Sequence, residues 1–324
     1  MNLLKRAALV ALLSVLVVAA LPAQQKPAAN GATKEVCVTF DDLPLNGPDQ
    51  GLKRLRAVNE KLIAVIRAHS IPAVGFVNES KLNRTGQAER VAILKLWLDA
   101  GLELGNHTYS HLSLHTTPLA AFEEDLVRGE TVTRRLMEPR GMKLRYFRHP
   151  FLQTGPTMEA RAAFEKFLAE RGYTVAPVTF DDADYVFNAI YAWARQRNDA
   201  ALAERTAAAY LEHMRTMFDY FEKLALEVVG SPVRHVLLLH DNELNADHFD
   251  GVARVLEQRG YKFVTLQRAL EDPAYRLADG YVGPRGLSWL HRWAYGKGMK
   301  ETMKSEPDPP DFIMKLYNEA MASR

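Results

Sequence analysis

Short apolar runs alternate with longer segments of helical periodicity along most of this chain. The short runs are typical of β-strands, which we predict at 35–40, 73–77, 103–106, 146–148, 173–179, 235–240 and 262–264. The longer segments favour helices near 52–69, 88–100, 118–138, 156–171 and 244–259. This alternation predicts an α/β fold with a parallel sheet and helices outside it. Closure of the strands would make a (β/α) barrel, but the pattern itself does not show closure.

Two regions are longer than the connections that alternating strands and helices need. Residues 186–230 are Ala-rich and charged, and they predict one or two long helices with a break at Asn198-Asp199. Their aromatic side chains could line a substrate cleft, but packing onto the barrel is favoured. The stretch 280–324 holds several aromatic residues and a Pro-rich segment, and we expect an extended wrap with a short terminal helix. The predicted barrel domain therefore covers 34–279.

The first 23 residues follow the pattern of a secretory signal peptide. Lys5 and Arg6 precede an apolar stretch too short to span a bilayer comfortably, and small residues near Ala23 suit cleavage. An uncleaved anchor is the alternative. Residues 24–33 contain Ala, Pro and Gly in a composition typical of a linker. We expect a secreted or periplasmic protein without stable membrane insertion after signal removal.

The charge balance argues against a polyanionic partner. The chain has 41 Lys and Arg against 39 Asp and Glu, and removal of residues 1–23 leaves 39 of each. No nucleic acid or anionic membrane is therefore expected as a partner. The single cysteine, Cys37, cannot form an internal disulfide, and we expect a buried thiol in the first strand.

Paired carboxylates and paired imidazoles are the first sign of chemistry. Asp41 and Asp42 follow the first predicted strand, and His107 and His111 follow the third with a spacing of four. In a helical turn that spacing puts both imidazoles on one face. One carboxylate and two imidazoles can hold a divalent metal, and the other carboxylate could act as a base on water. Each pair alone is a weak signal, because solvated turns and packed histidines are commoner.

Five segments in order resemble the polysaccharide deacetylase family, also called the NodB-homology family or family 4 carbohydrate esterases. They are Thr39-Phe40-Asp41-Asp42, His107 to His111, Arg148-His149-Pro150-Phe151, Asp184-Tyr185 and Leu237-Leu238-Leu239-His240. The resemblance covers roughly residues 34–270 and implies a distorted (β/α)7-type barrel. The motifs fall near the carboxyl ends of predicted strands, where chemistry collects in parallel α/β folds.

The resemblance implies one divalent metal and its base. Asp42, His107 and His111 match the metal ligands, with zinc favoured and cobalt, nickel or iron as alternatives. Asp41 matches the general base that takes a proton from the attacking water. Arg148 matches the arginine that pairs with and orients this base.

The resemblance also implies an acid and a substrate-binding wall. His240 matches the general acid that protonates the departing amine, and Asp184 matches the carboxylate that keeps this histidine protonated. The substrate is expected to contact Pro150, Phe151, Tyr185 and Leu238. Leu43-Pro44 and Tyr185 depart from the family's usual glycine and tryptophan, which weakens inference about the substrate more than about the reaction.

Other candidates carry weaker expectations. Residues 178–182 have the same five residue types, in the same order, as residues 38–42. The similarity does not extend further, so we interpret the repeat as a local coincidence and expect the metal at the first copy. His115 is not expected to be a ligand. Asp241-Asn242 either supports the backbone at His240 or forms a solvated turn. Surface or packing roles are expected for His149, His235, His248 and His291.

The sequence favours a metal-dependent deacetylase that hydrolyses N-acetyl groups, or secondarily O-acetyl groups, of an extracytoplasmic polysaccharide. An acetylated glycan is therefore the expected partner. One alternative is a metal-dependent amidohydrolase acting on a small amide or formamide. Another is a non-catalytic glycan-binding protein, although a pure binder needs no base, acid and metal together.

Overall fold

The computed structural model describes residues 34–48 and 51–322, so the expected signal peptide at 1–23 and linker at 24–33 lie outside the described residues. Seven strands form one sheet in which every pairing is parallel. They are β1 Lys34–Leu43, β2 Val74–Val77, β3 Glu103–Asn106, β4 Tyr146–Phe147, β5 Thr174–Val175, β6 His235–His240 and β7 Tyr261–Phe263.

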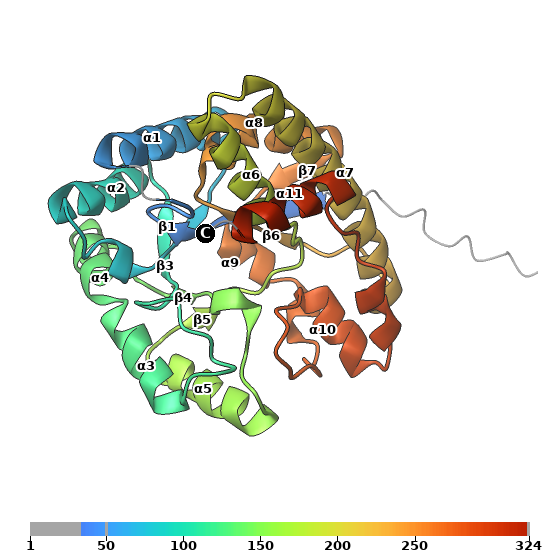
Figure 1. Cartoon of the computed structure of the whole chain (residues 1–324). Coiled ribbons are helices and arrows are strands. Elements are labelled where there is room, and N and C mark those ends of the chain that lie inside the picture. Colours follow the sequence, from blue (N-terminus) through green and yellow to red (C-terminus); the bar gives the residue numbers. More distant parts are fainter. Residues whose placement is uncertain (1–33, 49–50, 323–324) are drawn as a thin grey trace, which may run out of the picture. The chain divides into compact units, whose positions relative to one another are not determined.

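The strands follow the order β5-β4-β3-β2-β1-β6, and β7 pairs with the start of β1. The chain beyond β5 then returns to β6, where Phe180 forms an isolated bridge with Leu237 and the Thr179 amide donates to the Val236 carbonyl. This irregular contact joins the two ends of the sheet. The predicted class, α/β with a distorted (β/α) barrel, is confirmed (Figure 1).

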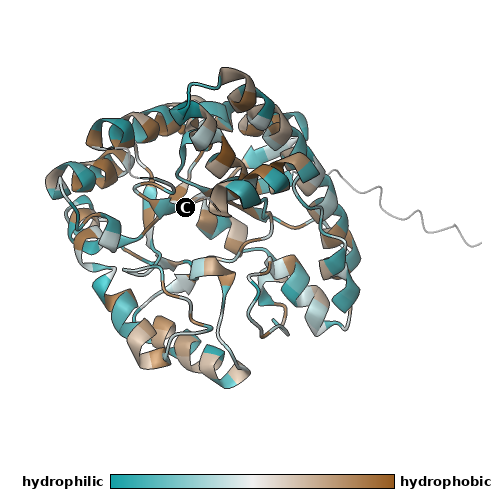
Figure 2. Ribbon diagram, in the orientation of Figure 1, coloured by the Kyte–Doolittle hydropathy of each residue, from teal (hydrophilic) through white to brown (hydrophobic). Residues whose placement is uncertain are grey.

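Eleven α-helices surround the strands in the described part of the chain (Figure 1). They are α1 Leu52–Ala68, α2 Gln87–Asp99, α3 Leu119–Arg128, α4 Thr131–Met137, α5 Met158–Glu170, α6 Asp184–Gln196, α7 Ala200–Val229, α8 Glu243–Gln258, α9 Leu266–Leu270, α10 Trp289–Gly296 and α11 Asp311–Ala322. Hydrophilic and hydrophobic residues mix along each outer helix (Figure 2), as expected when one face packs on a sheet and the other meets solvent. None of the described helices is long and apolar enough to cross a membrane.

Strand β1 lies at the centre of the core because it is buried along most of its length. The Phe40 ring meets the Trp97 ring of α2 and the Phe249 ring of α8 edge-on, at centroid distances of 5.8 and 5.2 Å. Cys37 is buried in the same strand, as predicted. Strands buried on both faces are typical of parallel sheets covered by helices.

The predicted helix 118–138 is interrupted between α3 and α4 at Gly129. A Cβ atom at Gly129 would lie 2.6 Å from backbone atoms of Thr108 and Tyr109. Only glycine therefore lets the helical segment pass this close to the loop after β3. The predicted break at Asn198-Asp199 is confirmed, since Asn198 has a φ of 56° and Asp199 caps α7.

The insertion and the C-terminal segment differ in how well they were predicted. Aromatic residues of α7 such as Tyr210, Phe218 and Phe221 are buried, so they pack rather than line a cleft. The segment after Gly280 ends in α11, which confirms the expected terminal helix, and it contains one α-helix that was not predicted, α10. Helix α11 packs against α6, so this segment contacts the insertion.

Candidate active site

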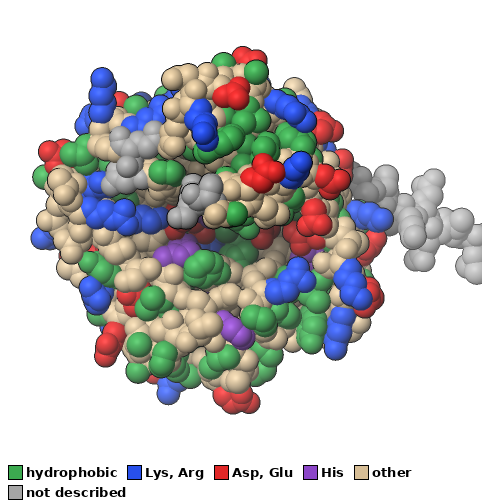
Figure 3. All heavy atoms as spheres, viewed as in Figure 1, with side chains coloured by type: hydrophobic (Ala, Val, Ile, Leu, Met, Phe, Trp, Pro, Cys, Tyr) green, Lys and Arg blue, Asp and Glu red, His purple; other side chains and the backbone are tan. Residues whose placement is uncertain are grey.

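A cavity of about 810 Å³ opens at the carboxyl ends of β1 and β6. Five of the residues predicted from the motifs to do chemistry line it, namely Asp41, Asp42, His107, His111 and His240. Figure 3 shows this hollow at the centre of the face, with a histidine side chain at its edge. The fold therefore collects side chains that are far apart in the sequence at one edge of the sheet.

Asp41 and Asp42 lie inside β1 rather than after it, so the predicted end of this strand was too early. In a regular strand their side chains would point to opposite faces. The register with β2 shifts between Phe40 and Leu43, and Asp42 has a φ of 72°. Such a bulge re-aims side chains, and it allows both carboxylates to line the cavity.

The loop after β3 carries His107 and His111, and it is not the helical turn that would put both imidazoles on one face. Thr108 and His111 have φ values of 63° and 59°, which a right-handed helix excludes. The side chain of Asn106 accepts the Thr108 amide at 2.7 Å, and the Thr108 hydroxyl accepts the His111 amide at 3.0 Å. These local bonds replace helical ones and still bring the two rings to a centroid distance of 4.8 Å.

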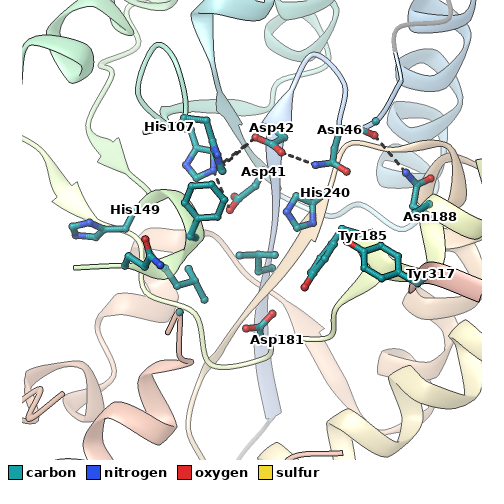
Figure 4. Close-up of a pocket in the computed structure, with 18 of the residues that line it drawn as sticks. Asp41, Asp42, Asn46, His107, His149, Asp181, Tyr185, Asn188, His240 and Tyr317 are labelled. Atoms are coloured by element: carbon teal, nitrogen blue, oxygen red, sulfur yellow. Dashed lines mark hydrogen bonds and ion pairs between the residues drawn. The ribbon is translucent and has the colours of Figure 1, made fainter. Parts of the chain in front are cut away.

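Asp42, His107 and His111 form a cluster whose ligand atoms all lie within 4.8 Å of one another. The Oδ1 atom of Asp42 is 3.9 Å from Nε2 of His107 (Figure 4). It is 3.7 Å from Nε2 of His111. This oxygen is buried, and the Lys81 ammonium lies 3.1 Å from it. A carboxylate oxygen and two imidazole nitrogens in this arrangement fit a divalent metal.

The tautomer of His107 is fixed by its surroundings. Its Nδ1 lies 2.8 Å from the Arg148 carbonyl oxygen, which can only accept a hydrogen bond. Nδ1 therefore carries the proton, and burial lowers the pKa of His107 so that the ring is neutral. The lone pair of Nε2 is left toward Asp42, as a metal ligand requires.

Two side chains that sequence reasoning missed hold Asp42. Lys81 forms an ion pair with Oδ1 at 3.1 Å and donates to the Asp42 carbonyl at 3.0 Å. Asn46 donates to Oδ2 at 2.6 Å. Burial alone would raise the pKa of Asp42, but Lys81 and the two histidines hold it well below its usual value. Neither residue belongs to a motif segment, so only the fold reveals these contacts.

Asp41 faces the cavity beside Arg148. The guanidinium of Arg148 is buried, approaches Oδ2 of Asp41 at 3.5 Å and donates to the Thr39 hydroxyl at 2.9 Å. Burial raises the pKa of Asp41 to about 6, an effect that Arg148 partly opposes. A carboxylate with a pKa in this range suits a general base near neutral pH.

His240, which lines the cavity, forms a short hydrogen bond with Asp184. Nδ1 of His240 lies 2.6 Å from Oδ1 of Asp184, and the other carboxylate oxygen accepts the His240 amide at 2.9 Å. Asn242 and Asn245 also donate to that oxygen, at 3.0 and 2.6 Å. Burial would lower the pKa of His240, but the Asp184 carboxylate outweighs this effect and raises it to about 10.

The segment after His240 supports the backbone rather than forming a solvated turn. Asp241 and Asn242 are both buried. The Asp241 amide donates to the Asp41 carbonyl at 3.0 Å, and its own carbonyl accepts the Asn46 amide. The first of the two expectations for this segment therefore holds.

Three of the four expected substrate contacts line the cavity: Phe151, Tyr185 and Leu238. Pro150 is buried and lies outside the lining, so this expectation is wrong. It begins a tight turn in which Phe151 has a φ of 55°, and the turn sends Phe151 rather than Pro150 to the surface. The Phe151 ring lies 4.4 Å from the His111 ring between centroids.

Several lining residues were not predicted. Asn46, Asn188, Asp181, Tyr317 and Met321 line the cavity, and His149 lines it as a buried side chain (Figure 4). The remaining histidines with expected packing roles include His235, whose ring stacks on Phe180 at 3.7 Å between centroids. His115 is outside the ligand cluster.

The repeated segments 38–42 and 178–182 lie on either side of β6. The first pairs with β6 through β1, and the second bridges it at Phe180. Asp181 of the second copy lines the cavity, and Asp182 accepts the Asp184 amide at 2.8 Å. Neither belongs to the ligand cluster formed by the first copy and the histidines.

Comparison with known proteins identifies the domain. Residues 28–167 match the family model described as polysaccharide deacetylase. No curated protein sequence matches the chain. Among solved structures, the polysaccharide deacetylase Bc1974 from Bacillus cereus is 18% identical, covers 72% of this chain and 91% of its own, and has a TM-score of 0.50.

Two further solved structures are similar at lower TM-scores. Peptidoglycan deacetylase PdaC from Bacillus subtilis is 20% identical over 74% of this chain and 91% of its own, with a TM-score of 0.48. BA3943 from Bacillus anthracis, described as a CE4 family pseudoenzyme, is 18% identical over 74% of this chain and 66% of its own, with a TM-score of 0.48. Residues 28–167 thus match the polysaccharide deacetylase family, whose members are hydrolases that act on C–N bonds of acetylated polysaccharides, and the five motifs lie in order on a distorted (β/α) barrel.

Proposed function

We propose that this protein is a metal-dependent deacetylase that hydrolyses N-acetyl groups of an extracytoplasmic glycan. The observation that carries the proposal is one cavity in which Asp41 stands beside the Asp42–His107–His111 cluster and His240 also faces the reacting centre. A ligand cluster, a base and an acid in reach of one substrate are the parts that amide hydrolysis needs.

Asp42, His107 and His111 would hold a divalent metal, which would supply a Lewis acid for the acetamide carbonyl. Zinc suits this donor set, with cobalt, nickel or iron as alternatives. Lys81 and Asn46 keep the Asp42 carboxylate ionised and oriented. The Arg148 carbonyl orients His107.

Asp41 serves as the general base. Its Oδ1 accepts no hydrogen bond from the described residues, so it is free to accept a proton from the attacking water. Arg148 pairs with the opposite oxygen, Oδ2. The carboxylate takes the proton as the water oxygen forms its bond to the acetamide carbon.

His240 serves as the general acid. Because Nδ1 is engaged by Asp184, the Nε2 proton is the one available to the cavity. That proton passes to the amide nitrogen as the C–N bond breaks, which releases acetate and a free amine. A raised pKa keeps His240 protonated at neutral pH, and an amine leaves poorly without a proton, so the pair favours N-acetyl over O-acetyl substrates.

Acetate release from the metal-loaded protein tests this function. We expect release from acetylated amino-sugar oligomers, and the Asp41→Asn variant should keep its metal but lose activity by roughly 10²–10⁴-fold, the usual contribution of a general base. Near-normal activity of this variant would reject the mechanism. Loss of both metal and activity would show that Asp41 is a ligand.

The same experiment separates the two other functions. The cavity volume lies within the range of small-molecule sites, about 300–1,000 Å³, which favours a small-amide hydrolase as second candidate. Turnover of small amides or formamides without release from any glycan would select that activity. Bound metal and glycan binding with no turnover would indicate a glycan-binding protein.

The extracytoplasmic location rests on the N-terminal pattern alone. A basic start, an apolar stretch and a small-residue boundary at Ala23 are typical of an exported protein. Cell fractionation followed by N-terminal sequencing should find a product that begins near Gln24 outside the cytoplasm. An intact Met1 start in the cytoplasm would contradict export and favour a small-molecule substrate.

A further inference from the structure

The C-terminal segment supplies one wall of the cavity. Tyr317 and Met321 of α11 line it, and so does Gly286 before α10. The matched family segment ends at residue 167, so these residues lie outside it. We propose, on the basis of the deacetylase function above, that this wall restricts the enzyme to short oligosaccharides and chain ends rather than internal units of a polymer.

Helix α11 is held firmly in this position. Ile313 is fully buried, and the Phe312 ring lies 4.0 Å from the Arg205 guanidinium of α7. The helix packs against α6, whose residues Asn188 and Ala189 line the same cavity. Figure 1 shows α11 in front of β6, at the end of the strands where the cavity opens. The wall is therefore part of the packed domain.

Tyr317 packs against the Tyr185 ring, which in turn packs against the catalytic His240. Its ring lies 6.4 Å from that of Tyr185, and the Tyr185 ring lies 6.0 Å from that of His240 (Figure 4). A polymer bound at an internal unit must extend away from the reacting acetamide in two directions. With Tyr185 beside His240 and Tyr317 packed against Tyr185, one of these directions is blocked by α6 and α11.

The cavity lining suits a sugar. Phe151 and Tyr185 are 54% and 47% exposed, although large apolar side chains are normally covered, and they flank His111 and His240 respectively. Aromatic faces of this kind bury the apolar side of a pyranose ring. Asp181 and Asn188 add polar groups to the lining, which suits the hydroxyls of a neighbouring sugar.

The space available agrees with a short ligand. A cavity of about 810 Å³ lies near the upper end of the range for drug-sized ligands, about 300–1,000 Å³. A volume of this size accommodates a few sugar units. The structure therefore assigns Tyr317 and Met321 as specificity-determining residues.

Substrate length is the test. The metal-loaded full chain is assayed on N-acetylchitooligosaccharides from the monomer to the hexamer and on soluble glycol chitin, and mass spectrometry locates the deacetylated unit. We expect kcat/KM per acetyl group at least about tenfold higher on the short oligosaccharides than on the polymer, with acetate lost from a terminal unit. Equal rates on the polymer, or deacetylation at internal units, would overturn the proposal.

Two variants locate the effect on α11. The double variant Tyr317→Ala, Met321→Ala should reduce the preference for short substrates about tenfold, whereas Lys315→Ala on the exposed side of the same helix should leave it unchanged. Metal content and the thermal midpoint show whether each variant is folded. An unchanged preference in a folded double variant would assign length selection elsewhere and contradict the role of α11.

Binding separates this proposal from the function on which it rests. Calorimetry of Asp41→Asn with the same oligosaccharides measures recognition without turnover. Oligosaccharide binding without acetate release by the unmutated chain would reject the deacetylase and support the pocket. Acetate release with equal rates on short and long substrates would support the deacetylase and reject the pocket. Absence of both binding and release would reject both.

Discussion

Arg148 connects the two halves of the catalytic constellation. Its backbone carbonyl accepts the Nδ1 proton of His107, and its guanidinium pairs with Asp41. One residue of the segment after β4 thus orients a metal ligand and the base together. Single side chains of this kind decide the chemistry because each has few partners and a fixed direction.

Removal of one imidazole should remove the metal. His107→Ala leaves two ligands, which hold a divalent metal poorly, so we expect loss of most bound metal and nearly all activity. Metal content by atomic emission is the measurement. His115→Ala is the matched control, because His115 follows in the same loop but lies outside the ligand cluster. Full occupancy in His107→Ala, His111→Ala would place the metal elsewhere.

The Asp184–His240 pair should govern the alkaline limb of the pH–rate profile. Asp184 raises the pKa of His240 to about 10, so the acid loses its proton only as the pH rises toward that value. In Asp184→Asn the carboxylate is gone and His240 holds its proton less tightly. The alkaline limb should therefore move to lower pH. An unchanged limb would exclude His240 as the acid that this limb reports.

At the scale of elements, strands were easier to predict than the loops between them. The predicted bounds of β3 and β6 are those of the structure. In β6 the four residues Val236 to Leu239 form a short apolar run between two histidines. The predicted pair of Asp184 with His240 is likewise present. The bulge at Asp42 and the loop at His107 departed from regular periodicity because contacts distant in sequence fix the backbone there.

The loop after β3 depends on Asn106. Its amide accepts from Thr108 and donates to the Leu126 carbonyl and the Tyr173 hydroxyl, all within 3.1 Å. Asn106→Ala should lower the free energy of unfolding by about 1–3 kcal/mol, the cost of unsatisfied buried partners. It should also weaken metal binding about 10–100-fold, as loss of ligand support does. Urea unfolding and metal titration measure the two effects, and unchanged metal affinity would show that the loop keeps its shape without Asn106.

At the scale of the whole domain, Arg292 fastens the C-terminal segment to the rim of the cavity. Its side chain is buried, binds Asp279 at 2.6 Å and donates to the Thr154 hydroxyl and the Tyr281 carbonyl. Gly286 passes so close to the Phe151 carbonyl that a Cβ atom there would lie 1.9 Å away. Sequence periodicity could not predict the contacts with Thr154 and Phe151, because they join residues more than a hundred positions apart.

Arg292→Met should destabilise the domain by about 3 kcal/mol, at the low end for a broken buried pair. The cost is limited because Arg161 still pairs with Asp279 at 2.9 Å. Lys166→Met is the control, since its pair with Glu170 is exposed and such pairs contribute at most about 1 kcal/mol. Urea unfolding compares the two. Equal midpoints would mean that the C-terminal segment is held without Arg292.

The hydrogen bond between His107 and the Arg148 carbonyl has a consequence for spectroscopy. The Nδ1 proton is buried and is donated to the Arg148 carbonyl oxygen of the same protein. It should therefore exchange slowly with solvent and give a resolved downfield resonance in proton NMR of the metal-free protein. Metal addition should shift this resonance without abolishing it, because the metal binds the other nitrogen. The signal would report the orientation of a ligand before any turnover is measured.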